Sequence, residues 1–183
     1  METQHERARL VCLTGPESSG KTTLAEALAR HLGAPLVPEV ARSYLAGRAG
    51  YQPEDLLAIA EAQLAAETAA LESGAPLVIA DTDLLVIRIW WEEKYGPLDA
   101  RLEADLTLLT PRLYLLAAPD IPWQPDPLRE SPHDRERLFQ RHVALLESLS
   151  APYRVIRGAR QTRLQTALEA MQEWLEGDEA PGG

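Results

Sequence analysis

The eight residues from Gly15 to Thr22 have types and a spacing that suit the phosphates of a nucleotide. They match the pattern G-x-x-x-x-G-K-[ST] in full. Glycines let main-chain N–H groups turn toward phosphate oxygens, and a helix that begins after such a loop supplies further unpaired N–H donors. The Lys21 ammonium suits the β and γ phosphates, and the Thr22 hydroxyl is an oxygen ligand of the kind Mg²⁺ prefers. We therefore expect ATP and Mg²⁺ as cofactors.

The surroundings of the motif agree with this interpretation. An apolar run over residues 8–14 reads as a buried strand, and leucine spacing over residues 20–31 predicts a helix. This context favours a phosphate site over a turn that is rich in glycine and serine by chance. For Thr23 the alternatives are an approach to the α phosphate and a place on the first turn of the helix. We expect these residues to bind the nucleotide: Gly15, Glu17, Ser18, Ser19, Gly20, Lys21, Thr22 and Thr23.

Two carboxylates follow the next clear strand candidate, residues 76–80. A carboxylate at the carboxyl end of a strand beside the phosphate loop is where Mg²⁺ is held in such folds, so Asp81 is the expected second metal residue with Thr22. Asp83 is a second candidate for contact with the metal or the substrate. The alternative for either aspartate is a cap on the helix that begins near Leu84.

A third carboxylate, Glu39, follows a short strand candidate over residues 35–37. If that strand belongs to the sheet, Glu39 faces the same crevice and can accept a hydroxyl proton as a phosphoryl group is transferred. The alternative is an ordinary acidic residue in the first turn of a helix over residues 39–45. Arg42 lies one turn further on, where it can pair with Glu39 or reach a substrate.

A proline-rich stretch over residues 119–132 predicts a loop, and we expect a lid over about residues 119–135. Arginines on such a segment can close over transferring phosphate, which makes Arg129 and Arg135 candidates. Arg137 and Arg141 fit salt bridges on a helix face better. Trp123 suits stacking on a planar ring or packing the loop down, and Asp126 is a candidate for hydrogen bonds to the substrate.

Strand and helix signals alternate along the chain, which predicts an α/β fold with a central parallel sheet. The five strand candidates span residues 8–14, 35–37, 76–80, 112–117 and 153–156. Helices are expected over residues 20–31, 39–45, 53–73, 83–91, 98–109, 134–148 and 161–175. We expect a three-layer fold in one domain over residues 1–176, with a flexible tail at 177–183.

Composition limits the function classes. The 183 residues carry a formal net charge of −10, which makes a nucleic-acid or membrane-surface partner improbable. No stretch is apolar enough for a signal peptide or a membrane span, and a single cysteine, Cys12, forms no internal disulfide, so we expect a cytoplasmic protein. The four histidines lack metal-site spacing, and we interpret His5, His31, His133 and His142 as surface or cap residues.

Several of these segments together resemble one family. The run Thr14 to Thr23 is similar to the phosphate loop of the nicotinamide riboside kinase domain in NadR-type proteins. The segments 38–42 (PEVAR) and 80–83 (ADTD) resemble its second-strand acid and its Asp-Thr-Asp sequence. The stretch 119–129, with its Pro-Trp pair and later Asp and Arg, resembles the lid. The likeness covers roughly residues 9–175.

This resemblance implies an adenylate-kinase-like sheet and transfer of the ATP γ-phosphoryl to the 5′-hydroxyl of nicotinamide riboside, giving nicotinamide mononucleotide. The catalytic residues would be Lys21, Glu39, Asp81, Arg129 and Arg135, and the substrate would meet Glu39, Arg42, Asp83, Trp123 and Asp126. NadR-type proteins also carry an adenylyltransferase, and only about eight residues precede the first strand here, so we expect no adenylyl transfer. Pro127 replaces a glycine that family members often carry, which would stiffen the lid.

Two other functions remain open at this point. One is a kinase for another nucleoside or small molecule. The other is a regulatory P-loop ATPase or GTPase without a small-molecule acceptor. A GTPase would carry an Asn/Thr-Lys-x-Asp guanine reader, which the sequence lacks. The partner we expect is therefore a small molecule, and the sequence does not indicate an oligomeric state.

Overall fold

The computed structural model describes residues 8–124 and 133–178, and its centre is a sheet of five parallel strands. The strands lie in the order β2-β3-β1-β4-β5, so the chain crosses over the sheet between neighbours. Their bounds are Arg9–Thr14 for β1, Leu36–Val37 for β2, Leu77–Asp81 for β3, Arg112–Ala117 for β4 and Tyr153–Ile156 for β5. The α/β fold with a central parallel five-stranded sheet is confirmed.

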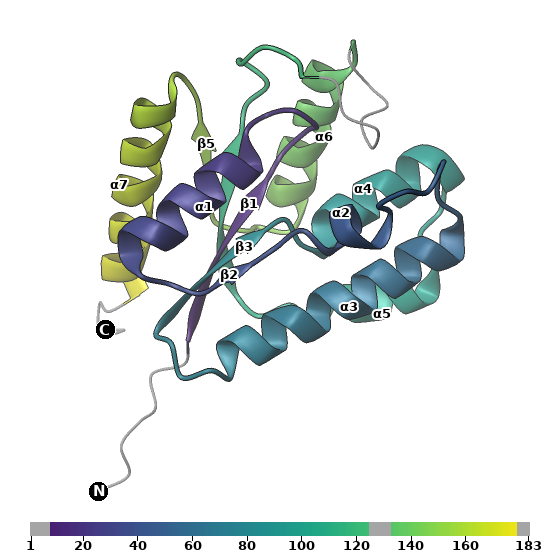
Figure 1. Ribbon diagram of the computed structural model, residues 1–183, viewed down its shortest axis with the longest axis horizontal. Helices are drawn as coiled ribbons and strands as arrows, with labels where there is room; N and C mark the ends of the chain where they lie inside the picture. Colours follow the sequence, from purple (N-terminus) through teal and green to yellow (C-terminus); the bar gives the residue numbers. More distant parts are fainter. Residues whose placement is uncertain (1–7, 125–132, 179–183) are drawn as a thin grey trace, which may run out of the picture.

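Helices cover both faces of this sheet (Figure 1). Their bounds are Lys21–Leu32 for α1, Val40–Tyr44 for α2, Pro53–Leu71 for α3, Leu84–Tyr95 for α4, Ala100–Leu106 for α5, Arg135–Ser148 for α6 and Arg160–Asp178 for α7. Side chains of α1 and α7 pack on one face of the sheet, and side chains of α3, α4 and α6 pack on the other. The result is the three-layer arrangement that the alternating pattern predicts.

The central strand β1 shows why the sheet needs cover on both faces. Val11 and Leu13 point into the core under α1 and α7, whereas Leu10 and Cys12 point into the core under α3, α4 and α6. All four side chains are fully buried. A strand that is apolar on both faces is stable only between two layers, which explains the continuous apolar run in the sequence.

A third core lies beyond the sheet, between α2, α3, α4 and α5. Its buried members include Leu45 of the segment after α2, Leu56 of α3, Leu84 of α4 and Leu102 of α5. This core holds the α2 and α4 helices at a fixed place beside the carboxyl ends of β2 and β3. Figure 1 shows these helices as a group that extends to one side of the sheet.

The strand register brings the candidate residues together. Leu13 of β1 pairs with Asp81 of β3 and with Leu115 of β4, so the strands end at one edge of the sheet. The phosphate loop follows β1 directly. Asp81 is therefore the last residue of the strand next to the loop, as the order of parallel strands requires.

Several helix ends differ from the expectations, most of all in α4, α5 and α7, and α5 spans only Ala100–Leu106 of the expected 98–109. The helix expected to stop at Trp91 continues to Tyr95, where Gly96 has a φ of 86°. The extra turn is stabilised because the Trp91 and Tyr95 rings pack edge to face, with centroids 5.5 Å apart. The tail expected from Gly177 is helical through Asp178, since one glycine weakens a helix by only about 1 kcal/mol.

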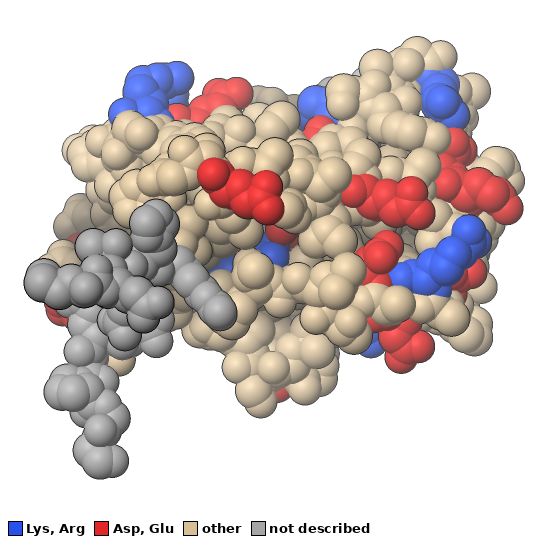
Figure 2. Space-filling model, turned by 90° about the horizontal axis from the view of Figure 1, so that it is seen from below, with Lys and Arg blue, Asp and Glu red and all other residues tan. Residues whose placement is uncertain are grey.

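Charged side chains are spread out on the face of the molecule that Figure 2 shows. Figure 2 shows one face, on which acidic side chains lie scattered among uncharged atoms and basic side chains form small separate areas. No described helix has both the length and the apolar composition needed to cross a membrane.

Candidate phosphate and acceptor site

The turn after β1 depends on two glycines. Gly15 has a φ of 133°, and a Cβ there would lie 2.6 Å from the carbonyl oxygen of Ala117. Gly20 has a φ of 83° and caps α1 in the left-handed conformation. Both positions disfavour a side chain, so the sequence motif is explained by backbone geometry. The turn leads directly into the N-terminus of α1, whose N–H groups open onto the cavity edge.

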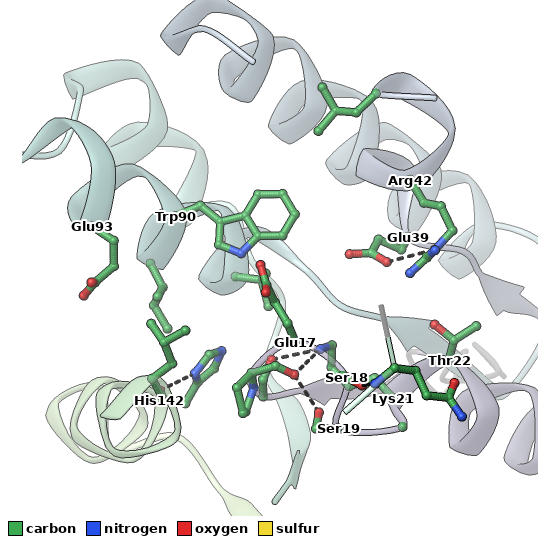
Figure 3. Close-up of a pocket in the computed structure, with 18 of the residues that line it drawn as sticks. Glu17, Ser18, Ser19, Lys21, Thr22, Glu39, Arg42, Trp90, Glu93 and His142 are labelled. Carbon is green, nitrogen blue, oxygen red and sulfur yellow. Dashed lines mark hydrogen bonds and ion pairs between the residues drawn. The ribbon is translucent and has the colours of Figure 1, made fainter. Parts of the chain in front are cut away.

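Side chains of the loop are held by its own carbonyl groups. The Lys21 Nζ donates to the carbonyl oxygens of Gly15 at 2.9 Å and Pro16 at 2.8 Å. The Ser19 hydroxyl, fully buried, donates to Pro16 at 2.7 Å. These bonds place the Lys21 ammonium across the concave side of the loop, as Figure 3 shows. A negatively charged ligand in the loop would meet both the ammonium and main-chain N–H groups.

Asp81 and Thr22 form the next part of the site. The Thr22 hydroxyl lies near enough to the Asp81 carboxylate to lower its pKa, and the carboxylate oxygen Oδ1 is buried without a hydrogen-bond partner among the described residues. Burial raises the pKa of Asp81, and the nearby Lys21 charge opposes that rise. A buried carboxylate oxygen beside a hydroxyl, with an unused lone pair, is a donor set that fits Mg²⁺.

Asp83 does not join this group, although it lies two residues away. Its carboxylate accepts from the backbone N–H of Leu85 at 3.0 Å and so caps α4. The other oxygen accepts from the Tyr114 hydroxyl at 2.7 Å and from Arg112 at 3.3 Å. Thr82, with a φ of 67°, separates the two aspartates. The expected substrate contact of Asp83 is therefore replaced by the alternative, a helix cap, because its lone pairs are already used.

Glu39 lies at the start of α2, where β2 ends, and lines the cavity together with Arg42. The two side chains form an ion pair at 3.5 Å. Burial raises the pKa of Glu39, while the Lys21 and Arg42 charges act in the opposite direction. Of the two alternatives for Arg42, the structure supports the pairing with Glu39, and the side chain also borders the cavity. Figure 3 shows this pair on one side of the cavity.

The cavity itself has a volume of 500 Å³, within the range of small-molecule sites. The phosphate loop and Ile121 form one wall. The opposite wall comes from α2 and the segment after it, from α4, and from α6. The cavity therefore has a phosphate end and a second end built from helices.

The second end contains aromatic residues that sequence reasoning missed. The rings of Tyr51 and Trp90 stack with centroids 6.0 Å apart, and the Lys94 Nζ lies 3.7 Å from the centre of the Tyr51 ring. Tyr51 precedes α3 and Trp90 lies on α4, 39 positions apart by the numbering of the sequence. Only the third core brings them together, so no local pattern could have indicated this wall.

The described part of the expected lid lies against the phosphate loop. Arg135 Nη1 donates to the carbonyl oxygens of Ser18 at 3.2 Å and Ile121 at 2.9 Å. Its guanidinium lies 5.7 Å from the centre of the Trp123 ring. Neither Trp123 nor Arg135 is among the residues that line the cavity, which favours the packing alternative for Trp123. Asp126 and Arg129 lie outside the described residues.

Arg163 is a further residue that the sequence did not single out. It is buried on α7 and donates to the carbonyl oxygens of Ser19 at 2.7 Å, Ala118 at 2.9 Å and Gly158 at 2.8 Å. It also pairs with Asp120. One side chain thus joins the phosphate loop, the end of β4 and the segment before α7, and it fixes the loop from behind.

Arg137 and Arg141 form salt bridges, as expected from their place inside α6. Their partners are on α4 and at the residue before α6. Arg137 pairs with Asp134, the N-cap of α6, and with Glu93 at 2.5 Å each, and Arg141 pairs with Glu92 at 2.6 Å. Arg137 and Glu93 also border the cavity. These exposed pairs connect the two helices at the edge of the site.

For His142, the interpretation as a surface or cap residue is wrong. Its side chain is 4 % exposed and borders the cavity from α6. The signal was present in the sequence: Phe139, His142 and Leu146 are spaced by three and four residues, which places all three on the buried face of the helix. Among the described residues, no cluster of three or more His, Cys, Asp or Glu side chains forms a metal site.

A family model described as an AAA domain, AAA_28, matches residues 10–163. That range runs from β1 through the phosphate loop and all five strands to the start of α7. The match therefore includes every described residue of the candidate site.

Solved structures with the same fold include a NadR protein in complex with NAD and AMP-PNP, at 24% identity and a TM-score of 0.73, covering 94% of this chain and 51% of that one. A second, NadR in complex with NR, has 24% identity and a TM-score of 0.71 and covers 93% and 52%. These two matches confirm the resemblance noted from the motifs. The chain spans about half the length of these NadR chains.

A thymidylate kinase from Ehrlichia chaffeensis is similar over its whole length, with 16% identity, a TM-score of 0.64, and 91% and 98% of the two chains covered. A deoxyadenosine kinase from M. mycoides has 12% identity and a TM-score of 0.64, with 90% and 99% covered. At these identities the likeness is one of fold. No curated protein matches the chain in sequence.

Proposed function

We propose, from the premise that this chain belongs to the AAA_28 family of AAA domains, that it is a P-loop phosphotransferase. It transfers the γ-phosphoryl group of ATP to a hydroxyl group of a nucleoside-like alcohol. Nicotinamide riboside is the first candidate for that alcohol, because two NadR structures share the fold and one of them is a complex with NR.

The observation that carries the proposal is the two-ended cavity. A loop built for phosphate lies at one end, and a wall of Tyr51, Trp90 and Glu93 lies at the other. A protein that only hydrolyses ATP needs the first end but has no need of a second. A pocket of 500 Å³ with an aromatic wall instead suits an organic acceptor beside the phosphates.

In this account the phosphate loop and Lys21 hold the β and γ phosphates through charge and main-chain N–H groups. Arg135 stands at the rim of the loop and neutralises negative charge that develops during transfer, with Arg129 as a second arginine from the lid. Glu17, Ser18, Ser19 and Thr23 complete the phosphate site. Placing both reactants in one cavity supplies much of the rate, since it replaces a bimolecular encounter with a positioned pair.

Thr22 and Asp81 are the residues that would hold Mg²⁺. When bound, the ion neutralises phosphate charge and orients the triphosphate. The fit rests on the unpaired, buried Asp81 Oδ1 next to the Thr22 hydroxyl.

Glu39 is the proposed proton acceptor. The attacking hydroxyl must lose its proton as the new O–P bond forms, and a carboxylate within hydrogen-bond reach can take it. Burial raises the pKa of Glu39, which makes the carboxylate a stronger base than an exposed glutamate. Arg42, paired with Glu39, holds the carboxylate at the cavity wall.

The experiment is an ADP-release screen with the purified chain, MgATP and single acceptors: nicotinamide riboside, the common nucleosides, and none. The account predicts ADP release only with an acceptor and a phosphorylated product of matching mass. Release that is equally fast with and without acceptors would favour the second candidate, a regulatory ATPase, which the AAA description of the family makes the natural rival.

A further inference from the structure

His142 presents one ring nitrogen that has no partner. Its Nδ1 lies 2.8 Å from the carbonyl oxygen of Leu138. A carbonyl oxygen only accepts hydrogen bonds, so the hydrogen of a neutral ring sits on Nδ1 and the lone pair sits on Nε2. Nε2 is buried and makes no hydrogen bond to any described residue. The bond to Leu138 therefore fixes both the tautomer and the direction in which the free lone pair points.

A buried hydrogen-bond acceptor without a partner is costly, so native proteins supply a partner from the chain, from water or from a ligand. Here the described chain supplies none. Burial lowers the pKa of His142 to about 4, and the Lys21 and Arg141 charges act in the same direction. The ring is neutral at physiological pH, and Nε2 stays an acceptor.

The position of His142 indicates what the partner is. The residue borders the cavity on the side of Trp90 and Glu93, across from Glu39 and Arg42 (Figure 3). The lining of the cavity also includes the apolar side chains of Val86 and Ile89 from α4 and Leu138 from α6. A ring nitrogen that only accepts cannot bond to phosphate or carboxylate oxygens, so its partner must bring an O–H or N–H group.

We propose that His142 Nε2 accepts a hydrogen bond from an uncharged O–H or N–H group of the phosphoryl acceptor, which makes His142 a specificity-determining residue of the acceptor end. This inference rests on the proposed function for the identity of that ligand. No proton is transferred in this contact: the donor keeps its hydrogen, and the ring keeps its own on Nδ1. A binding site with a neutral hydrogen-bond acceptor such as Nε2 discriminates against ligand analogues that lack the matching hydrogen-bond donor.

The test measures binding rather than turnover, so that it can be read even if no phosphate is transferred. Wild type, His142→Gln and His142→Leu, each saturated with AMP-PNP and Mg²⁺, are titrated calorimetrically with nicotinamide riboside and with adenosine. Analogues of each that lack one hydroxyl, amide or amino group complete the panel. Glutamine can place an amide oxygen near the position of Nε2, whereas leucine offers no acceptor.

The expected result is that His142→Leu weakens binding of at least one of these compounds about 3- to 10-fold, the range for one neutral hydrogen bond. His142→Gln restores most of that affinity, and AMP-PNP affinity is the same in all three proteins. The analogue that lacks the matching donor binds wild type and His142→Leu equally. Thermal unfolding of each variant checks that the fold is intact.

Three results would overturn the inference. In the first result, both variants bind every compound more weakly by the same factor, which indicates altered packing. In the second result, both variants bind every compound with the affinity of wild type, which means that Nε2 contacts only water. Binding of no compound in the panel would also count against it, whereas binding without phosphoryl transfer would contradict the proposed function alone.

Discussion

Lys21 donates to two carbonyl oxygens of the loop, and in the proposed reaction its ammonium turns to phosphate. Lys21→Ala removes the only side-chain cation that reaches across the loop from α1. We predict that phosphoryl transfer falls to the background rate while the thermal midpoint changes little, since Lys21 is only half-buried. An ADP-release assay with a parallel melting curve measures both. Retained activity in a folded variant would remove Lys21 from the phosphate site.

Glu39→Gln tests the proton acceptor, because it keeps the shape and removes the charge. We predict a fall in kcat of about 10²- to 10⁴-fold with a much smaller change in KM, the pattern of an interaction made in the transition state. Glu61→Gln, an exposed position on α3, is the matched control and should leave both constants unchanged. A kcat equal to that of wild type would show that another group takes the proton.

Single residues also show what the sequence can and cannot predict. The phosphate-loop residues follow from a local motif, because neighbouring positions in one turn act together. Trp90, Tyr51 and Arg163 act through partners far away in the sequence, such as Arg163 with Ser19. His142 stands between these cases: its helical spacing indicated burial, and a general preference of histidine for surfaces led to the wrong expectation.

The turn between β1 and α1 is the element on which phosphate binding depends. In Gly15→Ala the new Cβ would lie 2.6 Å from the Ala117 carbonyl oxygen, at a φ of 133°. Because backbone must move to relieve that contact, we predict at least a tenfold loss of AMP-PNP affinity. Calorimetric titration measures it.

Gly74→Ala is the control for this prediction. Gly74 also has a positive φ, of 84°, but no atom lies within 4 Å of the position a Cβ would take. That variant should lose about 1 kcal/mol of stability and keep its nucleotide affinity. Equal losses of affinity in the two variants would mean that backbone strain, and not the close approach to β4, is responsible.

A buried ion cluster connects α3, β4 and α4. Arg112 donates to Glu67 at 2.8 Å and to Asp83 at 3.3 Å, so a single cation faces two carboxylates. Burial raises the pKa of Glu67 to about 7, with the Asp83 charge adding to the rise and Arg112 opposing it. Asp83 caps α4, and Gln63 of α3 accepts from the backbone N–H of Val40 at the start of α2. The cluster thus supports both helices that carry the acceptor end.

The raised pKa of Glu67 makes stability depend on pH. The folded state keeps a proton on Glu67 up to about pH 7, whereas an unfolded chain releases it near the ordinary value of 4.5. The stabilisation from this proton is full below pH 4.5 and is lost as pH rises to about 7. We predict that Glu67→Gln gains roughly 1–3 kcal/mol relative to wild type between pH 5 and pH 8.

Chemical denaturation at the two pH values measures this gain, with Glu61→Gln on the same helix as the control. If the free energy of unfolding differs between variant and wild type by the same amount at both pH values, Glu67 is ionised throughout. The sequence could not have indicated this cluster, since its residues come from three elements that only the tertiary structure brings together.

The alternation of apolar runs with helical segments explains part of the arrangement of the whole molecule. Apolar runs alternating with helices predict a parallel sheet with two covered faces, and the structure has one. Residue patterns alone did not predict the order β2-β3-β1-β4-β5, because strand pairing depends on contacts between distant segments, and only the resemblance implied an adenylate-kinase-like sheet. The sequence did not indicate the third core between α2, α3, α4 and α5 either, although this core supports the acceptor end of the cavity.

The central claim is that the triphosphate of ATP lies in the loop from Gly15 to Thr22 with Mg²⁺ at Thr22 and Asp81. Calorimetric titration of AMP-PNP into wild type and Lys21→Ala, each with Mg²⁺ and with a chelator, tests it most directly. The account predicts one site in wild type, an affinity at least tenfold lower without Mg²⁺, and a similar or larger loss in Lys21→Ala. Equal affinity in all four titrations would contradict it.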